Sequence, residues 1–352
     1  MRASRGACEK YHGAVIGHAG RQDTRVFREV AALGAELDRL GPATLGARTP
    51  ARVALLFDWD SWWALEISDG PSRLLRYQQI VHAYYRALWE AGVDVDVLPV
   101  TADLAGYQVV VAPALHMVKG DLAERLAAVA ERGGSVLTTF LSGRVDEDDN
   151  AFLTDVPGPL GPLTGIRIDE WDARDPEVVN PVRLRGAEPQ AEIEVEARLL
   201  FELVIPQGAE VVGTYQADFY AGTPAVTRND YGAGHGWYVA TGLDQPGVSW
   251  VVRQVLARHD LLGPYADLPG LESTVRVAPD GTRLLFLLNH GTEPVETTVR
   301  VGGTDLLGGD RVEAGRPIRL DPVGCWCCVR TPTRPRRRRT GDRARRIPGG
   351  TR

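Results

Sequence analysis

Residues 52–57 read Arg-Val-Ala-Leu-Leu-Phe and are followed by polar Asp58, a pattern typical of a buried parallel strand. Further apolar runs at 93–98, 108–112 and 135–140 predict three more strands. Helices are expected at about 71–91, ending at Gly92, and at 120–132, before the Gly133-Gly134 turn. Strands separated by helices of this length form right-handed βαβ units. The sequence therefore predicts an α/β domain with an open, mostly parallel sheet flanked by helices.

The remainder of the chain changes pattern twice. Beyond Leu141 we expect proline-containing loops, strands near 167–170, 210–215, 225–229 and 236–241, and a helix at 248–259. From about Glu272 only strands are expected, at 274–277, 283–289, 296–301, 317–320 and 326–330, with turns at 280–281, 302–303 and 308–309. These short alternating runs predict a small antiparallel all-β domain after the α/β domain.

The first 48 residues are too few to build a core alone. A helix is expected at 24–40, capped by Asp23 or Thr24 and stopped by Gly41-Pro42. Its apolar residues form one stripe, made of Val26, Val30, Leu33, Leu37 and Leu40. Such a stripe needs a partner surface that the rest of the chain is not expected to supply.

Composition narrows the class of protein. No window of about 18 apolar residues predicts a membrane helix, and no signal peptide is recognisable, so we expect a cytoplasmic protein without a membrane partner.

The tail from Arg334 to Arg352 has nine arginines and one aspartate, a charge of +8, which leaves −14 for the other residues. This tail is expected to be disordered. A nucleic-acid-binding arm is the alternative, but no aromatic residue is present to stack on bases.

Several strings, taken in order, resemble the family 42 β-galactosidases. In the α/β region they are Phe57-Asp-Trp-Asp-Ser-Trp-Trp-Ala-Leu-Glu66, Tyr84-Tyr-Arg-Ala-Leu-Trp89, Tyr107-Gln-Val-Val-Val-Ala-Pro-Ala-Leu115 and Thr138-Thr-Phe-Leu-Ser-Gly-Arg-Val-Asp-Glu147. Phe286-Leu-Leu-Asn-His-Gly291 continues the resemblance in the β domain, and 2–12 resembles the end of the family's catalytic barrel. The resemblance covers roughly residues 2–330.

The resemblance implies four parts. They are a remnant of the last β/α unit of a TIM barrel (1–48), an α/β trimerisation domain (49–268), a C-terminal antiparallel β domain (269–331) and a disordered Arg-rich tail (332–352). The family hydrolyses terminal non-reducing β-D-galactose by a retaining mechanism with two glutamates. Both glutamates belong to earlier barrel strands, so no catalytic residue is expected in this chain.

By the same resemblance, Glu9 and His12 are the candidate substrate-binding residues. They match family residues that hydrogen-bond galactose hydroxyls, and a carboxylate with an imidazole suits that chemistry. A solvated loop is the alternative interpretation of both. The family also implies a homotrimer and a galactoside substrate; no cofactor and no metal are expected.

Other candidate sites have simpler interpretations. Trp59, Trp62, Trp63 and Trp89 could stack on sugars, but a core or interface role is favoured. The segment 232–236 is read as a turn between strands rather than a phosphate loop, and the acidic run 146–149 as a solvated loop rather than a cation site. Cys325, Cys327 and Cys328 are expected on a terminal strand rather than at a metal.

Three functions are compatible with the sequence. The first is the C-terminal part of a β-galactosidase, which is inactive alone, and the second is a non-catalytic oligomerisation module derived from that family. The third is a nucleic-acid-associated protein acting through the tail. The family's second domain resembles class I glutamine amidotransferases, but no cysteine lies between Cys8 and Cys325 to act as their nucleophile.

Overall fold

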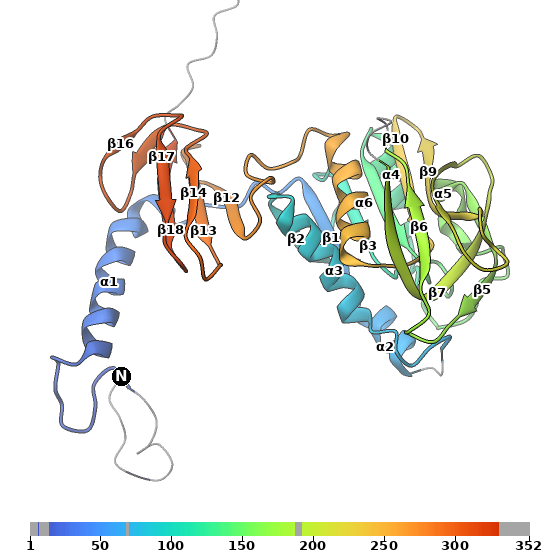
Figure 1. Ribbon diagram of the computed structural model, residues 1–352, viewed down its shortest axis with the longest axis horizontal. Coiled ribbons are helices and arrows are strands. Elements are labelled where there is room, and N and C mark those ends of the chain that lie inside the picture. The colour runs from blue at the N-terminus through green and yellow to red at the C-terminus, as the bar shows by residue number, and fades with distance from the viewer. Residues whose placement is uncertain (1–5, 7–13, 68–69, 187–191, 331–352) are drawn as a thin grey trace, which may run out of the picture.

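A computed structural model describes residues 6, 14–67, 70–186 and 192–330. Figure 1 shows an α/β domain, a smaller β domain beside it, and helix α1 (Arg25–Thr44) extending from the β domain on the side away from the α/β domain. The chain therefore divides as the sequence predicts, into an α/β body and a small all-β body. Glu9 and His12 lie outside the described residues, as does the tail from residue 331.

The first half of the large sheet is parallel, as predicted. Its strands run in the order β2-β1-β3-β4-β10, with β1 at the centre of the first three. Their bounds are β1 (Val53–Phe57), β2 (Val95–Pro99), β3 (Val109–Ala112), β4 (Ser135–Thr139) and β10 (Gly234–Val239). Every residue of β3 and β4 is buried, because helices cover both faces of this half.

The sheet continues beyond β10 through antiparallel strands, so the whole sheet is mixed. The order is β10-β9-β8-β6-β7-β11, and β5 also pairs with β7. The bounds are β5 (Ile166–Ala173), β6 (Asn180–Leu184), β7 (Ile193–Pro206), β8 (Glu210–Tyr215), β9 (Pro224–Tyr231) and β11 (Thr241–Leu243). The expectation of loops here was wrong for β6 and β7. Strand β7 pairs with β5, β6 and β11, and therefore organises this half.

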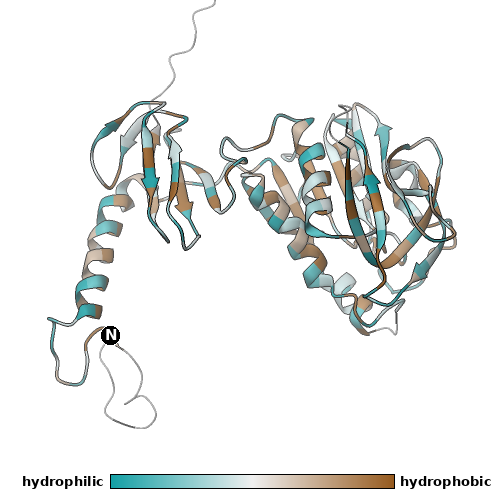
Figure 2. Ribbon diagram, viewed as in Figure 1, coloured by the Kyte–Doolittle hydropathy of each residue, from teal (hydrophilic) through white to brown (hydrophobic). Residues whose placement is uncertain are grey.

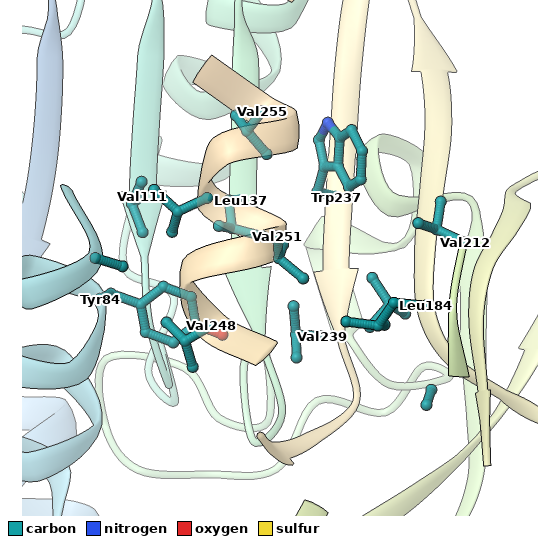
Figure 3. Packing of buried hydrophobic residues seen from close by; sticks show 14 of the residues in the cluster. Tyr84, Val111, Leu137, Leu184, Val212, Trp237, Val239, Val248, Val251 and Val255 are labelled. Atoms are coloured by element: carbon teal, nitrogen blue, oxygen red, sulfur yellow. The ribbon is translucent and has the colours of Figure 1, made fainter. Parts of the chain in front are cut away.

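Helices α3 (Tyr77–Glu90) and α6 (Gln245–Ala257) cover one face of the sheet, and α4 (Leu122–Glu131) covers the other. Alternate residues of a strand point to opposite faces, so Leu55 faces α3 and α6 while Leu56 faces α4. Figure 3 shows three valines of α6, at 248, 251 and 255, packed over sheet residues that include Leu137 and Val239.

Two predictions about the helices were wrong. The helix expected from about Pro71 begins only at Tyr77, because Ser72 closes a turn in which its hydroxyl accepts from Leu74 N. A separate helix, α2 (Trp59–Ile67), precedes it and was not predicted. The segment after β4 also forms two short turns of helix, η2 (Gly158–Leu160) and α5 (Gly161–Thr164). Residues 232–233 link β9 to β10 as a hairpin turn, as expected.

The β domain has a five-stranded antiparallel sheet in the order β12-β13-β18-β15-β16, with β14 and β17 paired beside it. Its strands are β12 (Leu271–Val277), β13 (Arg283–Asn289), β14 (Val295–Thr298), β15 (Gly303–Asp305), β16 (Arg311–Val312), β17 (Pro317–Leu320) and β18 (Cys325–Arg330). Gly303 is a strand residue, so the turn expected at 302–303 was wrong. Its ideal Cβ would lie 2.1 Å from Val329 O, which explains a glycine in this strand.

Helix α1 begins where the sequence predicts. Thr24 is the N-cap, and its hydroxyl accepts from Phe27 N. The predicted stop at Gly41-Pro42 was wrong, because the helix continues through Pro42 to Thr44. Proline lies near the last turn, where Leu45 N still donates to Gly41 O. Arg39 donates to Leu307 O, which links this helix to the β domain.

Candidate functional site

The apolar stripe of α1 is uncovered. None of its residues is buried, and Val26, Val30, Leu33 and Leu37 are 39–58% exposed. Figure 2 shows hydrophobic residues on this helix where neither domain covers it. Exposed apolar rows of this kind mark contact surfaces. The sequence-based expectation that the stripe needs another partner agrees with this geometry.

The carboxyl end of β1 holds a buried charged cluster. Asp58 follows the strand directly and is 4% exposed. Its Oδ2 accepts from the backbone N and the hydroxyl of Ser61, and its Oδ1 lies 2.7 Å from Lys119 Nζ. Lys119 also donates to Asp60 at 2.7 Å. Sequence reasoning missed this cluster, because Lys119 is 61 residues from Asp58. Both carboxylate oxygens of Asp58 have partners, so the cluster fixes the first turn of α2.

Four aromatic rings gather beside this cluster. Phe57 contacts Trp59 and Trp62 edge-on, with ring centroids 5.1 and 5.9 Å apart, and Trp59 lies 5.9 Å from Trp63. Trp62 packs on the core, whereas Trp59 and Trp63 are 54% and 57% exposed. A core role is therefore confirmed for Trp62, whereas Trp59 and Trp63 are not part of the core. Trp89 lies apart, against His290 of the β domain.

A second buried charge lies beyond β4. Glu202 of β7 is fully buried and accepts from Arg144 at 2.6 Å, from Leu141 N at 3.0 Å and from Tyr238 Oη at 2.7 Å. Burial raises the pKa of Tyr238 well above its usual value, and the neighbouring Glu202 carboxylate raises it further. Leu141 has a φ of 64°, a backbone strain that this network holds in place.

Asp94 and Asp260 line a small cavity of about 190 Å³. Asp94 and Glu272 both line a second cavity, but its volume is about 140 Å³, against roughly 300–1,000 Å³ for ligand sites. Asp94 accepts from the hydroxyl of Thr274, and Glu272 lies 2.6 Å from the His290 ring. Burial raises the pKa of Asp94 despite these hydrogen bonds. The two acids therefore serve the junction between the two domains.

The described part of the chain, residues 14–330 with its gaps, contains no group of three or more His, Cys, Asp or Glu placed to hold a metal. In the acidic run, Asp146 accepts from the backbone N of Asp148 and Asn150, which closes a surface loop.

Cys327 and Cys328 are buried on β18, as predicted. No helix among the described residues is long and apolar enough to cross a membrane.

Three family models match the chain. One described as the β-galactosidase trimerisation domain matches residues 51–262, one described as the β-galactosidase C-terminal domain matches 270–325, and one described as β-galactosidase matches 1–40. The β-galactosidase BgaA of Planococcus sp. (strain 'SOS Orange') is 44% identical over 307 residues, which are 86% of this chain and 44% of BgaA.

Solved structures agree with this match. A β-galactosidase from Bacillus circulans sp. alkalophilus superposes with a TM-score of 0.87 at 38% identity, covering 94% of this chain and 49% of that one. A catalytic mutant of Gan42B, a GH42 β-galactosidase from G. stearothermophilus, gives a TM-score of 0.84 at 32% identity, with coverages of 94% and 47%. The chain thus spans about half the length of the relatives it matches.

Proposed function

Because this chain belongs to glycoside hydrolase family 42, the family of these β-galactosidases, we propose that it supplies the part of such an enzyme that assembles it into a homotrimer. The observation that carries the proposal is the match of the trimerisation model to residues 51–262, together with the exposed apolar surface of α2. Solvent-exposed tryptophans favour burial against another surface.

We also propose the domain boundaries 1–48, 49–268, 269–331 and 332–352. The model matches at 1–40, 51–262 and 270–325 support the first three units. In this assignment α1 is the last helix of a β/α barrel, and its stripe packs against barrel elements that residues 14–67 and the other described segments do not include. A barrel helix is apolar on the side that faces its strands, which fits the row from Val26 to Leu37.

The activity that we propose for the whole enzyme is hydrolysis of terminal β-D-galactose with retention of configuration. Two glutamates on barrel strands act as acid and nucleophile about 5–5.5 Å apart. We propose that Glu9 and His12, near the end of that barrel, hydrogen-bond galactose hydroxyls. We therefore propose that the 352 residues include these two sugar contacts and neither glutamate of the pair.

A non-catalytic oligomerisation module is the second candidate. It is favoured by one observation: two cavities that are each lined by two acids have volumes of about 140 and 190 Å³, below the range of ligand sites. In that case the α/β domain has the same assembly role with no barrel to serve. For either candidate a cytoplasmic location is proposed, since four cysteines clustered in this way offer no disulfide framework.

Sedimentation equilibrium of the 352-residue chain tests the assembly role. A homotrimer has three times the 38.3 kDa mass of the chain, and this mass should persist over a tenfold dilution in the micromolar range. A protein that sediments with a single chain mass at every concentration would contradict the proposed trimer.

A further inference from the structure

Helix α2 carries large apolar residues on its outer side as well as its inner side, beside the exposed charges of Asp60 and Glu66. Its inner side is fixed, because Ser61 and Ala64 are buried. Its outer side carries Trp59, Trp63 and Ile67, spaced four residues apart and 54%, 57% and 85% exposed. Contiguous exposed apolar side chains of this size mark contact surfaces. The outer side of α2 is therefore shaped for a surface that covers it.

The apolar surface extends from α2 onto neighbouring elements. Phe57 joins the Trp59 ring to a groove of about 630 Å³, which Val97 and Tyr85 also line. Val97 belongs to β2, the edge strand of the parallel half, and is 53% exposed. We define the α2 face as the surface formed by Phe57, Trp59, Trp63, Ile67, Tyr85 and Val97. It is continuous from the end of β1 to the edge of the sheet.

The α2 face is held rigid before any partner binds. Asp58 accepts from the backbone N and hydroxyl of Ser61, and the Ser61 hydroxyl in turn accepts from Met117 N. Lys119 donates to both Asp58 and Asp60 at the start of the helix. Tryptophans that are already in place lose little conformational entropy on binding, and such residues dominate binding energy at interfaces.

Other exposed apolar side chains of the domain do not form such a surface. Leu153, Val211 and Phe219 come from separate loops and strands, and the exposed Trp171 is already covered on one side by the Arg144 guanidinium at 4.4 Å. Helix α1 does not cover the α2 face, because it extends from the far side of the β domain (Figure 1). Within the described part of residues 51–262, the α2 face gathers the exposed aromatic rings of Trp59, Trp63 and Tyr85, a residue class enriched at interface cores. The charged residues Asp60, Glu66 and Arg86 border it.

We infer that the α2 face is the surface through which one copy of this chain binds a second copy. The inference rests on the proposed trimerisation, since the trimerisation model spans the whole face. A closed ring of three copies uses heterologous contacts, so the α2 face of one copy packs on a different surface of the next. An interface of this kind buries about 800 Å² on each partner. Trp59 and Trp63 supply its centre, and the groove beside Val97 and Tyr85 supplies its margin.

The test compares the oligomeric state of three variants of the full chain with the wild type. Ile67→Glu places a charge on an 85% exposed position, so it does not affect folding, and Trp63→Ser removes a central ring. Each is expected to weaken self-association about 30-fold or more, as loss of a central interface residue does. Phe219→Ser is the matched control, because Phe219 is 73% exposed and lies outside the α2 face; it should leave the trimer unchanged.

The outcomes separate the two proposals. The inference is supported if the wild type and the Phe219 variant are trimers and the Ile67 and Trp63 variants are monomers. Circular dichroism shows whether those monomers are folded. A trimeric wild type whose Ile67 and Trp63 variants remain trimeric overturns the α2 face while the proposed trimerisation stands. A monomeric wild type overturns both. Tryptophan emission upon dilution gives an independent readout, since Trp59 and Trp63 move from a buried to a wet environment only if they lie in the interface.

Discussion

The ammonium of Lys119 lies 2.7 Å from Oδ1 of Asp58, at the carboxyl end of the parallel strand β1. The chain contains two lysines and 38 arginines, so a lysine at this position is an exception that the geometry explains. A compact ammonium donates to both Asp58 and Asp60, whereas a planar guanidinium needs more room. Burial alone would lower the pKa of Lys119, but the hydrogen bonds to the two aspartates raise it above 10.5.

We predict that Lys119→Met lowers the free energy of unfolding by about 1.5–3 kcal/mol, because it leaves the buried Asp58 carboxylate unpaired. Urea unfolding measures this change. Arg25→Met, which breaks the exposed Arg25–Glu29 pair, is the matched control and should cost less than about 1 kcal/mol. The stabilisation from Lys119 is complete below its unfolded pKa and is lost as the pH rises through the higher folded pKa, so the stabilities of the wild type and Lys119→Met should converge in strongly alkaline buffer. Equal losses at neutral pH would contradict this account.

Glu202→Ala is expected to destabilise the α/β domain by about 3–5 kcal/mol, because it leaves the Arg144 charge, which is 11% exposed, without its partner. Tyr238→Phe removes one donor from the same carboxylate and should cost about 1–3 kcal/mol. Thermal and urea unfolding report both values. Glu210→Ala, at a carboxylate that is 60% exposed, serves as the control. A Glu202 variant as stable as the Glu210 variant would show that the network does not hold the turn at Leu141.

Asp94→Asn is expected to leave stability unchanged at pH 4 and to raise it at pH 7. Burial raises the pKa of Asp94 in the folded protein, so ionisation disfavours the folded state as the pH rises from the unfolded value of about 3.9 through the higher folded value. Asparagine keeps the oxygen that accepts from Thr274 without that charge. Melting temperatures of both proteins between pH 4 and 7 test the sign. A variant less stable than the wild type at pH 7 but equal to it at pH 4 would contradict it.

The segment 1–48 should be cut by protease before either domain. Its helix has no buried residue, so opening it costs little free energy. Leu33→Ser should change the free energy of unfolding by less than about 0.5 kcal/mol, whereas Leu137→Ala in the sheet should cost about 2–5 kcal/mol. Limited proteolysis with mass spectrometry locates the first cuts. Protection of residues 14–48 equal to that of β3 and β4 would show that the chain itself covers the stripe.

The parallel half of the sheet could be predicted because its strands are short, apolar and separated by helices. Residues 53–57 and 109–112 are buried on both faces, which makes their sequences continuous apolar runs. The strand β13 was predicted to the residue for a similar reason, since Gly281 and the change after Asn289 mark its ends.

Strand β7 could not be predicted from local pattern. Its alternation fails at Leu199, which has a φ of 71°, and its pairs are with β5, β6 and β11 rather than with one neighbour. Helix α2 was missed because its apolar residues lie on all sides and leave no amphipathic period. The Asp58–Lys119 and Glu202–Arg144 pairs join residues 61 and 58 positions apart, and no spacing rule reveals such pairs.

The central claim is that these 352 residues carry the assembly part of a family 42 β-galactosidase and not its catalytic pair. Hydrolysis of a chromogenic β-galactoside by the purified chain tests this most directly. We predict that the chain releases no chromophore above the rate in buffer alone, whether or not it forms a trimer, because retaining hydrolysis needs two acids flanking the glycosidic bond. Turnover that co-elutes with the chain and rises in proportion to its concentration would contradict the claim.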